Sequence, residues 1–317
     1  ANYYGDPTGP REPSNPGGLG VTARFGPDSI VMPFLTTEVF PNDYDDTPPA
    51  DEEEPEPLPT CCSSVMFFPG IEGSRLYMKR DNGSEDQLWE PNIPADVADL
   101  YANTDGNSVN DVYARDIIKE TNLGPNIPQV RKKIYKSFSD DLDNLVSNNT
   151  IHEWQPVPYD WRMSVDDIVN GGVVLENDTN NIVTQVEQMA QASDTGKVNL
   201  VGHSNGGLMI KYLVKKLEDS GKASLVDSVV LVGSPQTGTP KGAIAVLNGI
   251  NFDGFLGVLA PQKYNKELAL NIAGAYALIP SEKFFENNVT PVVQFDSSVG
   301  DFAGLIHAYG NNIDTYQ

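Results

Sequence analysis

Cysteine is nearly absent from the chain. The 317 residues include two cysteines, the neighbours Cys61 and Cys62. Two adjacent cysteines without a third partner exclude a disulfide framework, so cysteine usage does not indicate a redox compartment. A disulfide between neighbouring residues is strained. We therefore interpret both as small buried residues that open a strand, in preference to a redox or metal-binding role.

Basic residues and long apolar runs are also scarce. Lys and Arg number 21 against 44 Asp and Glu, which gives a formal net charge of −23. This charge argues against nucleic-acid partners and against attraction to anionic membranes. No apolar run approaches the roughly 20 residues that span a bilayer, and the N-terminus lacks the features of a signal peptide. A chain that begins with Ala1 favours a mature or excised piece, for which we expect an extracellular or cell-surface location.

The first 60 residues differ in composition from the rest. Residues 1–60 hold twelve of the 24 prolines and carry twelve acidic against two basic side chains. Because this composition cannot form a packed core, we expect a Pro-rich acidic linker or extended arm, with one strand over Ser29–Phe40. The densest acidic run, Asp51–Glu54, is solvated in this interpretation, and a calcium site is the alternative.

Apolar periodicity alternates between strand and helix after residue 60. This order predicts an α/β fold over residues 61–240, with a mostly parallel sheet flanked by helices and joined by right-handed crossovers. Gly-rich apolar segments over 241–288 predict a helical cap or lid, and residues 289–317 a return segment toward the core. An ordinary packed subdomain is the other interpretation of the apolar segments. We expect strands at Val65–Phe68, Val112–Ile118, Ile151–Pro156, Val198–Val201 and Ser228–Val232, and helices at Gln129–Val146, Asn180–Gln191 and Leu208–Leu217.

Residues 79–128 are rich in Asn, Asp, Gly and Pro, so we expect a long surface excursion there. Within it, the stretch Asp105-Gly106-Asn107 and the nearby Asp111 suggest a calcium loop. Their spacing misses the EF-hand pattern and favours a plain turn. We therefore expect no metal site, and nothing in the sequence implies a cofactor.

The most informative stretch is Gly202-His203-Ser204-Asn205-Gly206, a G-x-S-x-G motif. The residues before it are typical of a short buried strand, and those after it keep helical spacing. A strand–turn–helix of this kind presents the nucleophilic serine of α/β-hydrolases, so Ser204 is the candidate nucleophile for acyl chemistry. An ordinary turn with an incidental serine is the alternative.

Crowding explains the two glycines of the motif. A serine at so sharp a turn has strained backbone geometry, and the residues two before and two after it approach so closely that a side chain would collide. Gly202 and Gly206 avoid this collision. The start of the following helix also directs backbone N–H groups toward the space above Ser204, where the Asn205 N–H would stabilise an oxyanion.

Three separated segments resemble the lecithin:cholesterol acyltransferase family of α/β-hydrolases. They are Phe68–Tyr77 (FPGIEGSRLY), Tyr159–Arg162 (YDWR) and the Gly202–Gly206 motif, in the family's order and spacing. The likeness covers roughly residues 63–317. It implies a lipid or other ester as substrate.

The resemblance implies roles near the nucleophile. In the family, the backbone N–H after the Pro-Gly pair completes the oxyanion hole, so Ile71, which follows Gly70, would work with Asn205. A tight strand-to-loop turn is the other interpretation of Pro69–Ser74.

The same resemblance implies a scaffold beside the pocket, made of Tyr159, Asp160, Trp161 and Arg162. A core anchor would use the same residues, and we favour that structural role. Trp89 would correspond to the family's mobile lid loop, without the cysteines that brace it in some relatives.

The base is harder to assign. Hydrolases of this fold order their triad as Ser, acid, His, and His307 is the one histidine after Ser204. Asp296 or Asp301 could orient it. Of the other two histidines, His152 precedes the motif, and we expect His203 to be packed.

The last residues favour a different interpretation. The stretch from Ile279 to Tyr316 resembles the segment that precedes the strands bearing the family's Asp and His. On that alignment the acid and base follow Gln317, with a C-terminal fragment of the same protein as a candidate partner, and His307 is a helix or surface residue. We therefore expect an incomplete fold.

These features predict a serine-dependent lipid ester hydrolase or O-acyltransferase that acts through an acyl-enzyme on Ser204. The alternative is a non-catalytic lipid- or partner-binding module built on an incomplete hydrolase core.

Overall fold

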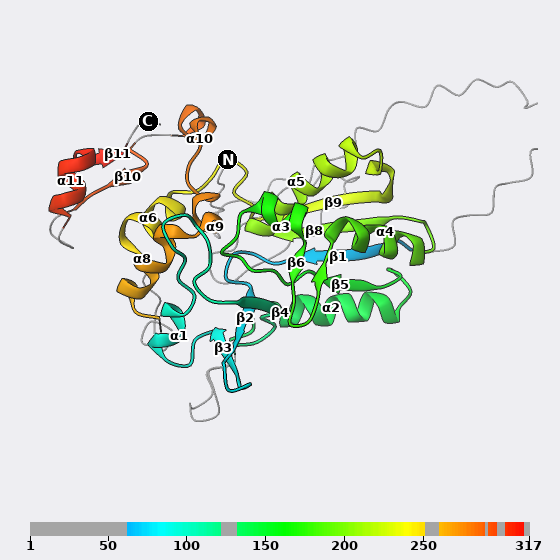
Figure 1. The fold of residues 1–317 in the computed structure, drawn as a ribbon. Helices are drawn as coiled ribbons and strands as arrows, with labels where there is room; N and C mark the ends of the chain where they lie inside the picture. Colours follow the sequence, from blue (N-terminus) through cyan, green and yellow to red (C-terminus); the bar gives the residue numbers. More distant parts are fainter. Residues whose placement is uncertain (1–61, 122–131, 251–259, 289–290, 297–301, 314–317) are drawn as a thin grey trace, which may run out of the picture. The chain divides into compact units, whose positions relative to one another are not determined.

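A computed structural model describes residues 62–121, 132–250, 260–288, 291–296 and 302–313 (Figure 1). The Pro-rich arm, its expected strand at Ser29–Phe40 and the acidic run Asp51–Glu54 lie outside the described residues. The strands are β1 (Ser64–Phe68), β2 (Ser74–Lys79), β3 (Glu85–Trp89), β4 (Val112–Ile117), β5 (Trp154–Pro156), β6 (Val173–Val174), β7 (Thr179–Asn180), β8 (Val198–His203), β9 (Val226–Val232), β10 (Val293–Gln294) and β11 (Asn312–Ile313). The helices are α1 (Pro94–Ala98), α2 (Lys136–Ser147), α3 (Val165–Gly171), α4 (Ile182–Ala192), α5 (Asn205–Asp219), the 3₁₀ helix η1 (Ala223–Leu225), α6 (Pro240–Asn248), α8 (Gln262–Asn271), α9 (Ala273–Tyr276), α10 (Glu282–Asn287) and α11 (Ala303–Tyr309).

The central sheet is parallel. Within the described part of the chain, its strands lie in the order β5-β1-β8-β9, and every neighbouring pair is parallel. The register pairs Phe68 with Gly202 and His203 with Val232. The carboxyl ends of β1, β8 and β9 therefore meet at one edge of the sheet. This arrangement confirms the predicted α/β fold with a parallel sheet.

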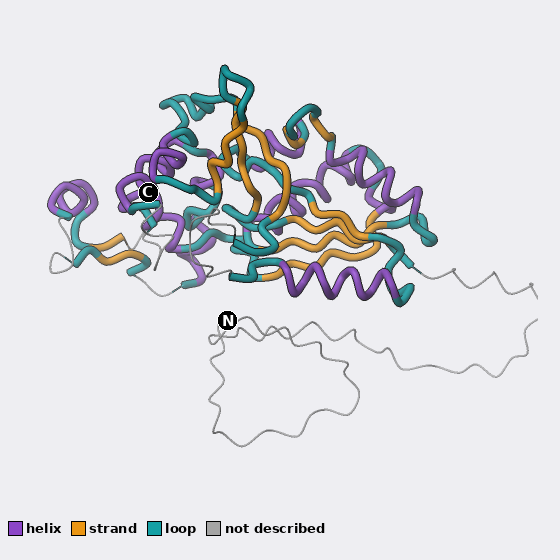
Figure 2. The backbone as a smooth tube through the Cα atoms, turned by 90° about the horizontal axis from the view of Figure 1, so that it is seen from below, coloured by secondary structure: helices purple, strands orange, loops and turns teal. Residues whose placement is uncertain are grey.

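Helices cover both faces of this sheet. Successive side chains of β1 point to opposite faces, so they pack against different helices. Val65 and Phe67 pack on the face that α2 covers, where Val65 clusters with Leu142. Met66 and Phe68 join the main core together with apolar side chains of α4 and α5. Figure 2 shows α2 running beside the strands. The nearly continuous apolar run of β1 follows from this two-sided burial.

The expected surface excursion over residues 79–128 is wrong for most of its described part. Strands β3, β2 and β4 form a second, antiparallel sheet in that order. Leu88, Trp89, Val97 and Leu100 are buried within the main core. Polar residues on the outer face of this sheet outnumber the apolar ones. For this reason the composition of the segment does not reveal the apolar face that packs on the core.

Helix α2 begins later than predicted. The sequence predicts a helix from Gln129, whereas α2 starts at Lys136. The residues just before it are bonded back to the end of β4: the Ile134 N–H donates to the Lys119 carbonyl (2.9 Å) and the Tyr135 N–H to the Ile118 carbonyl (3.2 Å). These bonds hold the entry to α2 in a non-helical conformation.

The C-terminal third is mainly helical. Helices α6, α8, α9 and α10 occupy most of the range for which a cap was predicted, and β10, β11 and α11 follow. Their role as a cap stays a prediction. Within the ranges that the structure describes, no helix has the length and apolar character needed to cross a membrane.

Cys62 requires a correction. It is buried directly before β1, as expected, but its sulfur takes part in a disulfide. The sequence holds one other cysteine, the neighbouring Cys61. The preference for two simple buried thiols is therefore wrong for Cys62.

Candidate active site around Ser204

Ser204 occupies the turn between β8 and α5. Its backbone has φ 50° and ψ −121°, on the side of φ that residues other than glycine rarely adopt. The Ser204 N–H donates to the carbonyl oxygen of Val232 at the end of β9 (2.9 Å), so the sheet holds the strained turn in place. The structure thus has the strained strand–turn–helix geometry that the motif predicts.

Close approach of backbone explains the glycines around Ser204. A Cβ on Gly202 would lie 2.7 Å from the Gly207 nitrogen and 2.8 Å from the Gly206 carbonyl carbon. A Cβ on Gly206 would overlap the carbonyl oxygen of Phe68. Both distances and the overlap are closer than real Cβ contacts allow, so the crowding inferred from the motif is present.

The loop after β1 lies directly against the nucleophile. A Cβ on Gly70 would be 3.0 Å from the Ser204 Cβ and 3.5 Å from its Oγ. The next backbone N–H in that loop belongs to Ile71, and the first N–H of α5 belongs to Asn205. Neither of these two N–H groups donates a hydrogen bond within the described part of the chain. The role of these two groups as oxyanion donors stays a prediction.

Two buried tyrosines hold the peptide group between Pro69 and Gly70. The Tyr159 hydroxyl donates to the Pro69 carbonyl oxygen (2.9 Å). The Gly70 N–H donates to the Tyr135 hydroxyl oxygen (2.9 Å). Both polar ends of one peptide group are thus bonded to tyrosine hydroxyls. These bonds fix the plane of the Pro69–Gly70 peptide, one residue before Ile71.

Each tyrosine is also bonded to a residue adjoining Ser204. The Asn205 Nδ2 donates to the Tyr159 hydroxyl oxygen (3.2 Å), and the Tyr135 hydroxyl lies 2.8 Å from His203 Nδ1. The loop after β1 is therefore connected to the residues before and after the nucleophile. Sequence reasoning identified Tyr159 and missed Tyr135, which carries no motif of its own.

Burial sets the protonation states of this cluster. Burial raises the pKa of Tyr135 to about 12, against a smaller opposing effect of its bond from Gly70, and burial also raises the pKa of Tyr159. Burial lowers the pKa of His203 below its usual value of 6.5. At neutral pH both phenols keep their protons and the imidazole is uncharged.

The Tyr159–Arg162 segment forms a buried polar anchor. Arg162 donates to both carboxylate oxygens of Asp160, from Nε (2.9 Å) and from Nη2 (2.6 Å), and both residues are 5% exposed. Arg162 Nη1 also donates to the Leu100 carbonyl and to Ser108 Oγ, both at 2.9 Å. Trp161 donates its indole N–H to the Ser74 carbonyl (3.2 Å). These bonds tie the segment to β2 and to the loop before β4, as expected for a core anchor.

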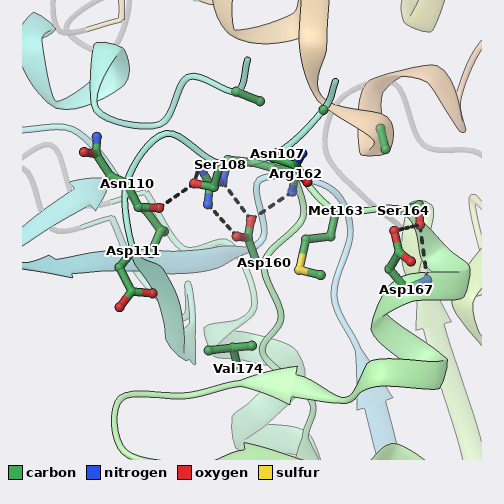
Figure 3. A pocket seen from close by; sticks show the side chains of 14 residues that line it. Asn107, Ser108, Asn110, Asp111, Asp160, Arg162, Met163, Ser164, Asp167 and Val174 are labelled. Atoms are coloured by element: carbon green, nitrogen blue, oxygen red, sulfur yellow. Dashed lines mark hydrogen bonds and ion pairs between the residues drawn. The ribbon is translucent and has the colours of Figure 1, made fainter. Parts of the chain in front are cut away.

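A polar cavity of about 250 Å³ lies beside this anchor (Figure 3). Asp160 and Arg162 form part of its wall, with Ser108 bonded to the guanidinium. The stretch suggested as a calcium loop also lies here and forms a turn, in which Asn103 Oδ1 accepts from the Asp105 and Asn107 N–H groups. No cluster of metal-ligating side chains is present among the described residues.

Glu72 is a carboxyl that sequence reasoning passed over. It follows Ile71 with φ 61°, and its side chain makes no hydrogen bond within the described ranges. Protein surrounds the carboxyl closely, although the residue keeps some contact with solvent, and burial raises its pKa to about 7. Its carbonyl oxygen accepts the indole N–H of Trp89 (3.0 Å). Trp89 ends β3, is buried and packs against Trp161, so it does not lie in a loop as the resemblance implied.

Comparison with known protein families gives one match. The family model described as "Lecithin:cholesterol acyltransferase" matches residues 123–299, which is more than half of the chain. The chain belongs to this family. The match contains Ser204 and the Tyr159–Arg162 segment, and it leaves out Phe68–Tyr77.

Other comparisons add little. No curated protein matches the chain. Among solved structures it is similar to the one titled "The crystal structure of Tle4-Tli4 complex", with 17% identity and a TM-score of 0.40. That alignment covers 72% of this chain and 56% of the other, so this chain matches under two thirds of that protein's length.

His307, the one histidine after Ser204 in the sequence, makes no hydrogen bond to Ser204 among the described residues. His307 lies on α11 and Asp296 follows β10, and neither hydrogen-bonds Ser204 Oγ, which has no hydrogen-bond partner among the described residues. His152 is 3.5 Å from Asp194 at the far end of the β-strands. Asp301 lies outside the described residues. Ser204 thus lies against the loop that carries Gly70, whereas His307 and Asp296 are not bonded to it.

Proposed function

We propose that this chain is a serine-dependent lipid ester hydrolase or O-acyltransferase of α/β-hydrolase type, acting through an acyl-enzyme on Ser204. The observation that carries the proposal is the position of Ser204 at φ 50°, against Gly70, where the N–H groups of Ile71 and Asn205 donate no hydrogen bond to any described residue. Membership of an acyltransferase family supports the substrate class.

The proposed reaction has two halves. Ser204 Oγ attacks the ester carbonyl carbon and gives its proton to a base, while the two N–H groups donate hydrogen bonds to the carbonyl oxygen on which negative charge develops. The alcohol leaves with a proton, and the acyl group stays on Ser204. Water then releases a fatty acid, or a second alcohol takes the acyl group.

The C-terminal helices offer a suitable place for an acyl chain. A cavity of about 530 Å³ lies among α6, α9, α10 and the segments that follow them. Its lining is largely apolar and includes Val246, Leu247, Ile279, Phe285 and Val293. An apolar cavity of this size fits a long hydrocarbon chain, which supports a lipid ester over a polar one.

Two sources of the base remain in the proposal. One is His307, oriented by Asp296, after a movement that brings α11 to Ser204. The other is a histidine on a separate segment, such as a C-terminal fragment of the same protein, that pairs with β9. In the described structure β9 is an edge strand, and Val229 on it is 42% exposed. An exposed apolar edge of this kind is a ready partner for another strand.

Intact-mass analysis after treatment with a fluorophosphonate tests the proposal. We expect one adduct on the wild-type chain and none on Ser204→Ala, with Ser281→Ala as the matched control that keeps labelling. Loss of the adduct in His307→Ala would identify that residue as the base. Retention in His307→Ala would require another one.

The same experiment addresses the rival function. Ser204 Oγ lacks a base among the described residues, which favours a non-catalytic lipid- or partner-binding module. A wild-type chain that takes up no probe, either alone or with the C-terminal fragment added back, yet binds a fluorescent fatty acid, would overturn the enzymatic proposal in favour of this module.

A further inference from the structure

The Tyr135 hydroxyl has a fixed hydrogen-bond direction. It accepts the Gly70 N–H and keeps its own proton at neutral pH, so that proton is free to be donated. The second neighbour, His203 Nδ1, lies 2.8 Å away and belongs to an uncharged ring. Nδ1 must then be the acceptor, and the ring proton must be on Nε2. The three groups form a directed chain from Gly70 through Tyr135 to His203.

This chain lies beneath the loop that carries the proposed oxyanion donor. Tyr135 is 7% exposed and packs edge-on against Phe67 of β1 (5.0 Å between ring centroids). A Cβ on Gly73 would be 3.0 Å from the Tyr135 hydroxyl, so the oxygen lies close to both Gly70 and Gly73. His203 is the residue before Ser204 and pairs with Val232 in the sheet. The phenol thus links this loop to His203, the residue before Ser204.

We infer that Tyr135 is a positioning residue for acyl transfer at Ser204: its hydroxyl, held by the Nε2–H tautomer of His203, fixes the Pro69–Gly70 peptide. The bond from the Gly73 N–H to the Gly70 carbonyl (3.0 Å) fixes the next peptide, so the two bonds together orient the Ile71 N–H. This inference rests on the proposed function. It assigns to His203 the role of hydrogen-bond acceptor and leaves the role of base to another group.

Tyr135→Phe removes the hydroxyl and keeps the ring packing. We expect the maximal rate of fluorophosphonate labelling to fall about ten-fold, with little change in the probe concentration for half-maximal rate. A misdirected oxyanion donor reduces the stabilisation of the transition state and leaves binding of the probe unchanged. Tyr113→Phe is the matched control. Tyr113 is equally buried (6% exposed) and its hydroxyl is also hydrogen-bonded, but on the antiparallel sheet. It should label at the wild-type rate.

Two substitutions of His203 separate positioning from packing. Asn at this position places an acceptor oxygen near the site of Nδ1, whereas Leu does not. We expect His203→Asn to label near the wild-type rate and His203→Leu to resemble Tyr135→Phe. Equal loss in both His203 variants would overturn the inference.

Nitrogen NMR of the labelled imidazole gives a readout that does not depend on activity. We expect the wild-type His203 to have an unprotonated Nδ1 and a protonated Nε2, and Tyr135→Phe to lose this preference. A protonated Nδ1 in the wild-type chain would overturn the hydrogen-bond direction on which the inference stands. If the wild-type chain takes up no probe, the proposed function fails and the catalytic role of Tyr135 with it, while the NMR result still decides whether the chain of hydrogen bonds exists.

Discussion

Tyr159 and Asn205 are 46 positions apart in the sequence, and the side-chain amide of Asn205 donates to the hydroxyl oxygen of Tyr159 at 3.2 Å. The Tyr159 hydroxyl in turn donates a hydrogen bond to the Pro69 carbonyl oxygen. The family's Tyr-Asp-Trp-Arg segment thereby contacts the nucleophile's turn through one phenol. Asn205 Oδ1, by contrast, is buried without a hydrogen-bond partner in the described structure.

Tyr159→Phe should destabilise the fold substantially. The change leaves the Pro69 carbonyl and the Asn205 amide without their partner in a buried site, and each such loss costs about 1–3 kcal/mol. We expect urea unfolding to show a free energy lower by about 2–4 kcal/mol. In the control Tyr77→Phe, the hydroxyl makes only long bonds of 3.3 and 3.5 Å, so the loss should stay under about 1 kcal/mol. Equal losses would contradict the role of Tyr159.

Gly206→Ala should prevent normal folding of the turn. The new Cβ would overlap the Phe68 carbonyl oxygen at the end of β1, and backbone cannot yield there without breaking the sheet. We expect a loss of about 3 kcal/mol or more in thermal or urea unfolding. Gly171→Ala in α3 is the control, since nothing lies within 4 Å of its Cβ position. It should leave stability unchanged or raise it by up to about 1 kcal/mol.

Arg162→Met should be far more damaging than loss of an exposed ion pair. It leaves the Asp160 carboxylate buried and unpaired, which costs about 3–5 kcal/mol. Arg80→Met removes bonds to Asp86 and Asp99 at a side chain that is 36% exposed, and we expect a much smaller loss of stability, because solvent screens exposed ion pairs. The double variant Asp160→Leu/Arg162→Met should recover part of the loss, because no buried charge remains. A double variant less stable than Arg162→Met would argue against this account.

Glu72→Gln should change how stability depends on pH. The pKa of Glu72 is about 7 in the folded chain, against the ordinary value of 4.5 for a glutamate side chain, so the folded state favours the protonated form. Below pH 4.5 the carboxyl is neutral in both states. Between pH 4.5 and 7 the unfolded chain ionises first, and the wild-type protein loses stability as pH rises.

Glutamine is neutral at every pH, so the stability of the variant relative to wild type should rise between pH 4.5 and 7. We expect the difference in unfolding free energy to be near zero at pH 4 and to reach on the order of 1–3 kcal/mol by pH 8. Glu176→Gln, at a side chain 37% exposed, serves as the control. A difference between Glu72→Gln and wild type that does not vary with pH would disprove the shifted pKa.

The parts of this structure that sequence predicts best are those with local causes. The nucleophile's turn depends on residues within five positions, and its strand and helix have apolar spacing that neighbouring residues alone reveal. The parallel sheet follows from the alternation of such segments. Family motifs extend this to Ile71 and Tyr159, because they record contacts that distant segments make in the fold.

What sequence missed depends on contacts between distant segments. Tyr135 is 65 positions from Gly70 and 68 from His203, and nothing in its neighbours indicates that its hydroxyl meets both. The antiparallel sheet was missed because its strands are rich in charged side chains that pair with one another, such as Arg115 with Glu85. The late start of α2 has the same origin, since bonds to residues 118 and 119 override local helix preference.

The edge strand β9 has a direction as well as an open side. It runs parallel to β8, so any further strand that continues the parallel sheet would also end at the edge where Ser204 lies. The residue that follows such a strand would emerge on the nucleophile's side of the molecule, whichever polypeptide supplied it. The sheet therefore dictates where a catalytic group on an added strand would lie, and a strand of the opposite direction would place its last residue at the other end of the sheet.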